Sequence, residues 1–120
     1  MLSNLKSQMR KGLLEYCILA IISREEAYAS DILDQLKVAQ LVVVEGTVYP
    51  LLTRMKNEGL LSYRWQESTE GPPRKYYALT EQGKQLLTQL DSEWLSICQT
   101  INQITNQDPN LQQVINPQQS

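Results

Sequence analysis

Apolar residues recur every three or four positions through the first part of the chain, the spacing that places side chains on one face of an α-helix. The residues at intervals of four are Leu5, Met9, Leu13, Cys17 and Ile21. This pattern predicts a first helix from about Asn4 to Ser23. After a short polar turn at Glu25–Ala29, Ser30 and Asp31 are residue types that begin helices, so a second helix is expected there.

A third helix is predicted from about Glu45 to Glu58. Gly59 follows it, and glycine readily adopts the left-handed conformation that ends helices. Pro50 has no N–H to donate, so we expect it in the first turns of this helix or at a distortion of them. The short apolar run Leu41–Val44 is placed in the turn between the second and third helices.

Two segments rich in Tyr, Trp and Leu, Leu60–Gln66 and Arg74–Leu79, predict a pair of β-strands. Between them, Glu67–Pro73 contains the sequence Gly-Pro-Pro, which is typical of turns. We therefore expect a β-hairpin with a protruding loop. Thr80 is a favourable N-cap and Glu81 a favourable first-turn residue, so a last helix is predicted from there to about Asn106.

The last helix carries apolar residues spaced three and four apart, as in the heptad repeat of a coiled coil. These residues, called the heptad seam below, are Leu87, Leu90, Trp94, Ile97, Ile101 and Ile104. Such a seam on a helix that extends past a small domain predicts a homodimer, with Leu5 and Met9 of the first helix completing the interface. The alternative is an intramolecular core that covers the seam.

Three helices, a hairpin and a long helix form the order of a winged helix-turn-helix protein. The expected fold class is mostly α with a small β-hairpin. Residues 1–79, which include the N-terminal helix, would form the winged helix-turn-helix DNA-binding domain. Residues 80–106 would form the dimerisation helix. Residues 107–120 are rich in Gln and Asn, and we expect them to be a disordered tail.

Charge and composition modify this picture only slightly. The chain has 120 residues, a net charge of −2 and a pI of about 5.1, which by themselves argue against a nucleic-acid partner. The charges are uneven, because residues 1–80 carry ten basic and nine acidic side chains and residues 81–120 carry one and four. A local basic face decides contact with DNA, so the net charge is a weak objection.

The remaining chemistry excludes several classes of protein. The chain lacks histidine and a CxxC pair, so neither an enzyme nor a metal site is expected, and no cofactor is implied. Cys17 and Cys98 are expected to be buried free thiols. The basic residues before the first apolar stretch are superficially like a signal peptide, but Glu15 interrupts that stretch. We therefore expect a helix of the folded protein, no membrane span and a cytoplasmic location.

The third helix offers a candidate surface for DNA. At 100° per residue, its apolar residues Val48, Leu51, Leu52 and Met55 fall together and should face the core. The residues on the opposite side and its margins are Gly46, Thr47, Tyr49, Pro50, Thr53, Arg54, Lys56 and Asn57. Arg54 and Lys56 could reach phosphates, and Thr53 or Asn57 could touch base edges. The alternative is an ordinary solvated helix face.

The hairpin adds two cations to this surface. Arg74 and Lys75 follow the Gly-Pro-Pro sequence, and a cationic pair at a hairpin tip can lie along the phosphate backbone or enter the minor groove. Glu67 and Glu70 in the same loop would repel phosphate. The alternative is a charged strand edge that prevents edge-to-edge pairing.

Four linked motifs resemble the PadR family of transcriptional regulators over about residues 10–100. They are Gly46-Thr47-Val48-Tyr49-Pro50-Leu51-Leu52, Gly59-Leu60-Leu61, Gly71-Pro72-Pro73-Arg74-Lys75-Tyr76-Tyr77 and Leu79-Thr80-Glu81-Gln82-Gly83. The resemblance implies repressors that bind operator DNA as dimers, with the third helix as recognition helix and the last helix as dimerisation element. The chain departs from the pattern at Val44, where such proteins often have a capping serine, and at Ala29-Ser30, where they often have Gly-Tyr.

The leading hypothesis is therefore a homodimeric repressor that binds double-stranded, palindromic operator DNA. The alternative is a winged-helix protein-interaction module without specific DNA binding. The tryptophan in the middle of the heptad seam, Trp94, is similar to one in PadR-like proteins that stack flat hydrophobic ligands between subunits. It suggests a small hydrophobic or aromatic effector, and the alternative is an aromatic anchor that simply fills the interface.

Overall fold

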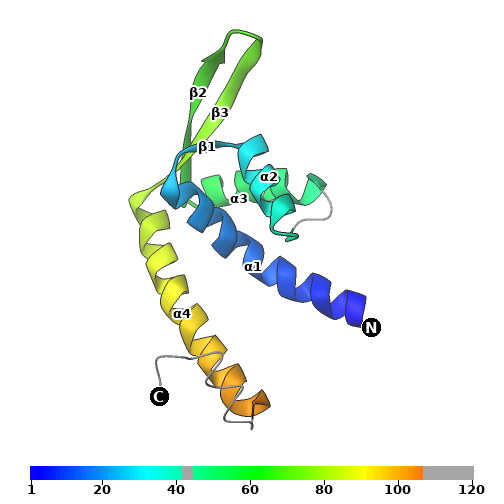
Figure 1. Ribbon diagram of the computed structural model, residues 1–120. Helices are drawn as coiled ribbons and strands as arrows, with labels where there is room; N and C mark the ends of the chain where they lie inside the picture. The colour runs from blue at the N-terminus through cyan, green and yellow to red at the C-terminus, as the bar shows by residue number, and fades with distance from the viewer. Residues whose placement is uncertain (42–44, 107–120) are drawn as a thin grey trace. The chain divides into compact units, whose positions relative to one another are not determined.

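The computed structural model describes residues 1–41 and 45–106 (Figure 1). The helices are α1 (Leu2–Arg24), α2 (Ala29–Val38), the 3₁₀ turn η1 (Glu45–Thr47), α3 (Val48–Asn57) and α4 (Glu81–Thr105). The strands are β1 (Ala27–Tyr28), β2 (Leu61–Ser68) and β3 (Gly71–Leu79), which form an antiparallel sheet in the order β1-β3-β2. The chain divides into two compact units, residues 1–87 and the part from Thr88 onward.

The core of the first unit joins one face of each of the first three helices to the base of the hairpin. Its buried apolar residues are Leu14, Ile18, Leu19, Ile22, Ala27, Ile32, Leu33, Leu36, Val48, Leu52, Met55, Leu60, Leu61 and Tyr77. Leu61 and Tyr77 anchor the hairpin at its base, whereas its outer half is largely exposed. Figure 1 shows β2 and β3 extending away from α1, α2 and α3 as a wing.

The third helix ends within one residue of its predicted end at Glu58, but its α-helical part begins at Val48, after η1, and not at the predicted Glu45. Gly59 follows α3 with a φ of 83°, and the Leu60 N–H donates a hydrogen bond to the Met55 carbonyl at 3.0 Å. This 6→1 bond is typical of a glycine-terminated helix, so the prediction for Gly59 is confirmed. Pro50 is the third residue of α3, inside the first turn where a missing N–H costs no intrahelical bond.

The predicted extent of the hairpin loop is wrong. The sequence predicts a loop over Glu67–Pro73, but β2 continues to Ser68 and β3 begins at Gly71, which leaves two residues between the strands. Ser68 pairs with Gly71, with an irregularity between Gln66 and Ser68. The two prolines that follow Gly71 are tolerated because this part of β3 pairs with β2 alone, so its other edge needs no N–H donor.

The polar turn expected at Glu25–Ala29 contains a strand instead. In β1, Ala27 pairs with Tyr77 and Tyr28 with Tyr76, which makes the sheet three-stranded. Two residues are too few to show the alternation that identifies strands in a sequence. The second helix also begins one residue earlier than predicted, at Ala29, and Asp31 lies in its first turn, where its carboxylate accepts a hydrogen bond from the Tyr28 N–H at 3.2 Å.

The start of α4 is fixed by Thr80 and Gly83. The Gly83 N–H donates to Thr80 Oγ1 at 3.0 Å, which confirms Thr80 as the N-cap, and Thr80 Oγ1 lies 2.6 Å from the Gly59 carbonyl oxygen. A Cβ at Gly83 would lie 2.2 Å from the Leu60 carbonyl oxygen, so only glycine lets the helix approach the end of α3 this closely.

Two predictions fall on residues outside the described ranges. The first is the turn predicted at Leu41–Val44, of which only Leu41 is described; Val44, where the chain departs from the family pattern, lies in this gap. The second is the tail predicted at 107–120. Within residues 1–41 and 45–106, none of the helices combines the length and the apolar character needed to cross a membrane.

Candidate nucleic-acid interface

One side of α3 is built into the core and the other faces solvent. Val48, Leu52 and Met55 are fully buried, as predicted, and Leu51 is half-buried. All the candidate DNA-contacting residues of η1 and α3 are exposed. They are Gly46, Thr47, Tyr49, Pro50, Thr53, Arg54, Lys56 and Asn57. The helical projection therefore separates the packed and solvent-facing sides of this helix correctly.

The exposed residues of α3 divide between two neighbours. Thr47, Pro50 and Arg54 border a cavity of about 440 Å³ against α1. There the Arg54 guanidinium forms an ion pair with the Glu15 carboxylate, and its Nε lies 3.4 Å from Glu58 Oε1. Two carboxylates thus offset the charge of Arg54, whereas the sequence predicts that Arg54 contacts a phosphate.

Tyr49 and Thr53 face the wing instead. Together with Trp65, Arg74 and Lys75 they line a cleft of about 470 Å³ between α3, the start of α2 and the hairpin, here called the wing cleft. Residues from three elements that are far apart in the sequence converge in it. This cleft brings together four of the predicted DNA-contacting residues and separates them from the α1 side of the helix.

The Thr53 hydroxyl already has a partner within α3. Thr53 Oγ1 donates to the Tyr49 carbonyl oxygen at 3.2 Å, one turn earlier in the helix. The single hydroxyl proton is therefore committed to the backbone. What Thr53 can still offer to a ligand is its methyl group and the lone pairs of its oxygen.

Two lysines lie close to the aromatic rings of the half-buried Tyr63 and the exposed Trp65 on one face of the wing. Lys75 Nζ lies 4.7 Å from the centroid of the Tyr63 ring and 5.7 Å from that of Trp65, and Lys56 Nζ of α3 lies 5.6 Å from Tyr63. Trp65 pairs with Lys75 across the strands, so these groups share a face of the hairpin. Rings attract these cations without neutralising them, so both charges remain available to an anion.

Arg74 occupies a different setting beside the start of α2. Its guanidinium lies 3.8 Å from the centroid of the Tyr28 ring, and one of its nitrogens lies 3.4 Å from Ser30 Oγ. Tyr28 is itself packed against Tyr76 at 4.8 Å between centroids. On β2, Arg64 lies 4.8 Å from the Tyr76 ring and 3.4 Å from a carboxylate oxygen of Glu26.

The prediction that the cationic pair Arg74 and Lys75 lies at the tip of the wing is also wrong. Arg74 pairs with Gln66 and is the fourth residue of β3, so the cations lie ~10 Å along the strand from its first residue. The side chains nearest the tip include the exposed acidic residues Glu67 and Glu70. The wing therefore offers its positive charge along its middle.

Sequence reasoning missed Tyr28, Ser30, Tyr63 and Trp65 as parts of this surface. The alternation of aromatic residues in β2 marks Tyr63 and Trp65 as sharing a face, but nothing local to Tyr28 or Ser30 indicates a contact with a residue more than forty positions away. Burial, and after it the nearby Tyr63, raises the pKa of the Tyr77 phenol, which stays neutral at pH 7 and serves in the core.

The heptad seam on α4 retains much apolar surface. Leu87 and Leu90 are half-buried, whereas Trp94, Ile97, Ile101 and Ile104 are 40%, 48%, 50% and 72% exposed. On α1, Leu5 and Met9 are 52% and 69% exposed. Each of these predicted interface residues thus has apolar area that a second chain could bury.

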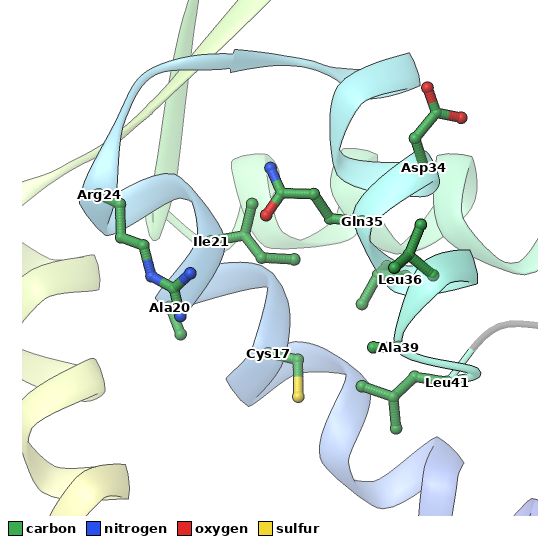
Figure 2. A pocket seen from close by; sticks show the side chains of 10 residues that line it. Cys17, Ala20, Ile21, Arg24, Asp34, Gln35, Leu36, Ala39 and Leu41 are labelled. Carbon is green, nitrogen blue, oxygen red and sulfur yellow. The ribbon is translucent and has the colours of Figure 1, made fainter.

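A separate apolar cavity of about 490 Å³ lies between α1 and α2 (Figure 2). Its lining includes Cys17, Ile21 and Leu41, with Arg24 and Asp34 among its polar members. Cys17 and Cys98 are free thiols, as predicted, but both are half-buried. Burial raises the pKa of the Cys17 thiol, so it is protonated at pH 7. The described part of the chain holds no group of three side chains suited to a metal ion.

Comparison with known proteins identifies relatives of this chain in sequence and in fold. A family model described as "Transcriptional regulator PadR-like family" matches residues 18–89. A PadR-like transcription factor from Bacteroides fragilis is 60% identical, with a TM-score of 0.72 over 85% of this chain and 99% of that one. A PadR-like transcriptional regulator from Bacillus cereus is 39% identical, with a TM-score of 0.74 over 84% and 99% of the two chains.

One related structure contains nucleic acid. Bacillus subtilis PadR, solved in complex with operator DNA, is 29% identical, with a TM-score of 0.59. The match covers 69% of this chain and 45% of that protein.

Proposed function

Because the chain belongs to the PadR-like family of transcriptional regulators, a family of regulators and not of enzymes, we propose that it places α3 in the major groove of operator DNA with the wing beside it. The DNA-bound relative supports a duplex as the partner. The observation that carries the proposal is the wing cleft, where the exposed side of α3 meets the cations of β3. A recognition helix beside a cationic strand can read bases and hold the phosphate backbone at the same time.

The contacts divide by chemistry. The exposed Arg74 and Lys56 and the half-buried Lys75 have the charge to hold phosphates, while the exposed Thr53 and Asn57 of α3 would meet base edges. Tyr49 and the η1 residues Gly46 and Thr47 complete the exposed surface.

Binding-site selection from random duplex DNA tests the proposal. We expect a defined sequence to emerge and its affinity to fall as salt rises. Arg74→Ala should weaken all sequences alike and lower the slope of log K against log salt by about 0.9. Asn57→Ala should change the preferred bases more than the overall affinity. If no sequence is enriched over random DNA, the protein-interaction alternative takes its place.

The active species we propose is a homodimer, joined through the heptad seam and by Leu5 and Met9, and acting as a repressor in the cytoplasm. The exposed apolar area on α4 supports this assembly. Two-fold symmetry would place two copies of α3 about one DNA turn apart, ~34 Å, and so select a palindromic operator.

An effector site at Trp94 extends this proposal. A tryptophan is oversized for a heptad position, so its pairing with a symmetry mate would leave room for a flat aromatic molecule. A ligand that prefers one subunit arrangement would shift operator affinity and release the repressor. Planar dyes should then quench Trp94 fluorescence, measured in a Trp65→Phe background, and lower operator affinity. Failure of a diverse planar set in both measurements would leave Trp94 as a packing residue.

A further inference from the structure

Arg74 is exposed and yet held from two sides. The carbon of its guanidinium lies over the Tyr28 ring, 3.8 Å from the centroid, and one guanidinium nitrogen lies 3.4 Å from Ser30 Oγ. Tyr28 is fixed in turn by three contacts: its strand pairing with Tyr76, the ring contact at 4.8 Å and the hydrogen bond from its N–H to Asp31. A side chain that normally samples many rotamers therefore has a defined position.

The partners of Arg74 differ from those of the neighbouring arginines. Arg54 and Arg64 lie against the carboxylates of Glu15 and Glu26. The contacts of Arg74 within the described residues are instead with a phenol ring and a hydroxyl, which leave its full positive charge in place. A guanidinium that stacks on an aromatic ring contacts it through its flat face, which leaves the N–H donors in its plane for other partners.

We propose that Tyr28 and Ser30 are positioning residues for DNA binding, which hold the Arg74 guanidinium ready to receive a backbone phosphate. This inference rests on the proposed function. Immobilising a long side chain on binding costs affinity, and a side chain that is already ordered avoids most of that cost. Since Tyr28 directly precedes α2, the same stack also ties the phosphate contact of the wing to the helix-turn-helix.

A double-mutant cycle between Tyr28 and Arg74 tests the proposal, with Kd for the selected operator as the readout. Tyr28→Leu should weaken binding roughly two- to tenfold, the cost of ordering one side chain. The salt slope should stay unchanged, because Arg74 still reaches its phosphate. Arg74→Ala should lower that slope by about 0.9. In the Arg74→Ala background, Tyr28→Leu should have no further effect, because Tyr28 then has nothing to position.

Matched variants separate positioning from a general effect on folding. Tyr28→Phe keeps the ring and should restore most of the affinity that Tyr28→Leu loses. Lys75 lies on β3 next to Arg74 but over Tyr63, so Tyr28→Leu and Lys75→Ala should be additive. If Tyr28→Leu lowers the melting temperature markedly, Ser30→Ala takes its place in the cycle, since it removes one contact of Arg74 without touching the core.

A measurement on the protein without DNA keeps the inference distinct from the proposed function. Stacking over Tyr28 should shift the NMR signals of the Arg74 side chain upfield, and Tyr28→Leu should remove that shift while Tyr28→Phe keeps it. If the wild type binds no duplex specifically, both the proposed function and this role fail. If it binds but the cycle is additive, or Tyr28→Phe is as weak as Tyr28→Leu, or the upfield shift is missing, the positioning role alone is refuted.

Discussion

Exchanging Thr53 for serine or valine separates the two groups that this side chain can present to a base. Its hydroxyl proton is bound to the Tyr49 carbonyl at 3.2 Å, so the methyl group is the part that remains for recognition. The thymine C5-methyl in the major groove is the natural partner for such a group. Thr53→Val keeps the methyl group and removes the hydroxyl, whereas Thr53→Ser does the opposite.

The size of the effect follows from the burial of one methyl group. Removing a methyl group from water contributes about 0.8 kcal/mol, which is roughly fourfold in Kd. Thr53→Ser should therefore weaken operator binding about fourfold. Thr53→Val should stay within about twofold, because valine and threonine have similar helix propensities and the lost hydrogen bond is exposed.

Deoxyuridine provides the complementary change on the DNA. Replacing each operator thymine in turn by deoxyuridine removes one methyl group, and fluorescence anisotropy then gives Kd for each duplex. At one operator position, replacing thymine by deoxyuridine should raise Kd about fourfold for the wild type and for Thr53→Val. The same replacement should leave Kd unchanged for Thr53→Ser.

Thr105 is the matched control, because its hydroxyl donates to the Ile101 carbonyl at 2.7 Å in the same one-turn geometry on α4. Thr105→Ser should bind like the wild type at every position. If Thr53→Val loses base preference and Thr53→Ser retains it, the hydroxyl reads the base and the reasoning from the Tyr49 contact is refuted.

Three further predictions follow from single contacts. Gly83→Ala should lower the free energy of unfolding, measured in thermal melts, by about 1–3 kcal/mol, because its Cβ would lie 2.2 Å from a backbone carbonyl oxygen. Gly12→Ala is the control and should not destabilise the protein, because a Cβ at Gly12 would have no atom within 4 Å. Arg54→Gln should leave the slope of log K against log salt unchanged, since carboxylates already offset the charge of Arg54. Lys75→Ala should lower that slope by about 0.9. Equal slopes for the two variants would contradict the prediction that Lys75 contacts a phosphate and Arg54 does not. Ile97→Asp would bury an unpaired charge at the proposed dimer interface and should give monomers by light scattering; a persistent dimer would exclude the seam.

The helices and their ends could be predicted because their signals are local. Periodic apolar residues mark α1 and α3, and single residues such as Gly59 and Thr80 have one suitable role at a helix terminus. The side of α3 that packs and the side that faces solvent follow from the same periodicity. These features need only the order of residues within one or two turns.

The interface could not be predicted in full because its contacts join distant parts of the chain. Strand β1 has two residues and acquires its conformation by pairing with β3. Arg54 looks available in the sequence, yet its partner Glu15 comes 39 positions earlier, on another helix. The prolines before Arg74 predict a turn and so place Arg74 at the tip, but strand pairing, which is set by both strands together, carries the hairpin further out.

These distant contacts also explain how a nearly neutral domain could present a cationic surface. Ten basic and nine acidic side chains in residues 1–80 would largely cancel if they were mixed evenly. Instead, carboxylates lie beside Arg54 and Arg64, while Lys56, Arg74 and Lys75 lie over aromatic rings. A ring lowers the energy of a cation without removing its charge, so these three keep their field toward solvent. Attraction to DNA depends on the charges that remain unneutralised near the phosphates, and the net charge of the chain does not report it.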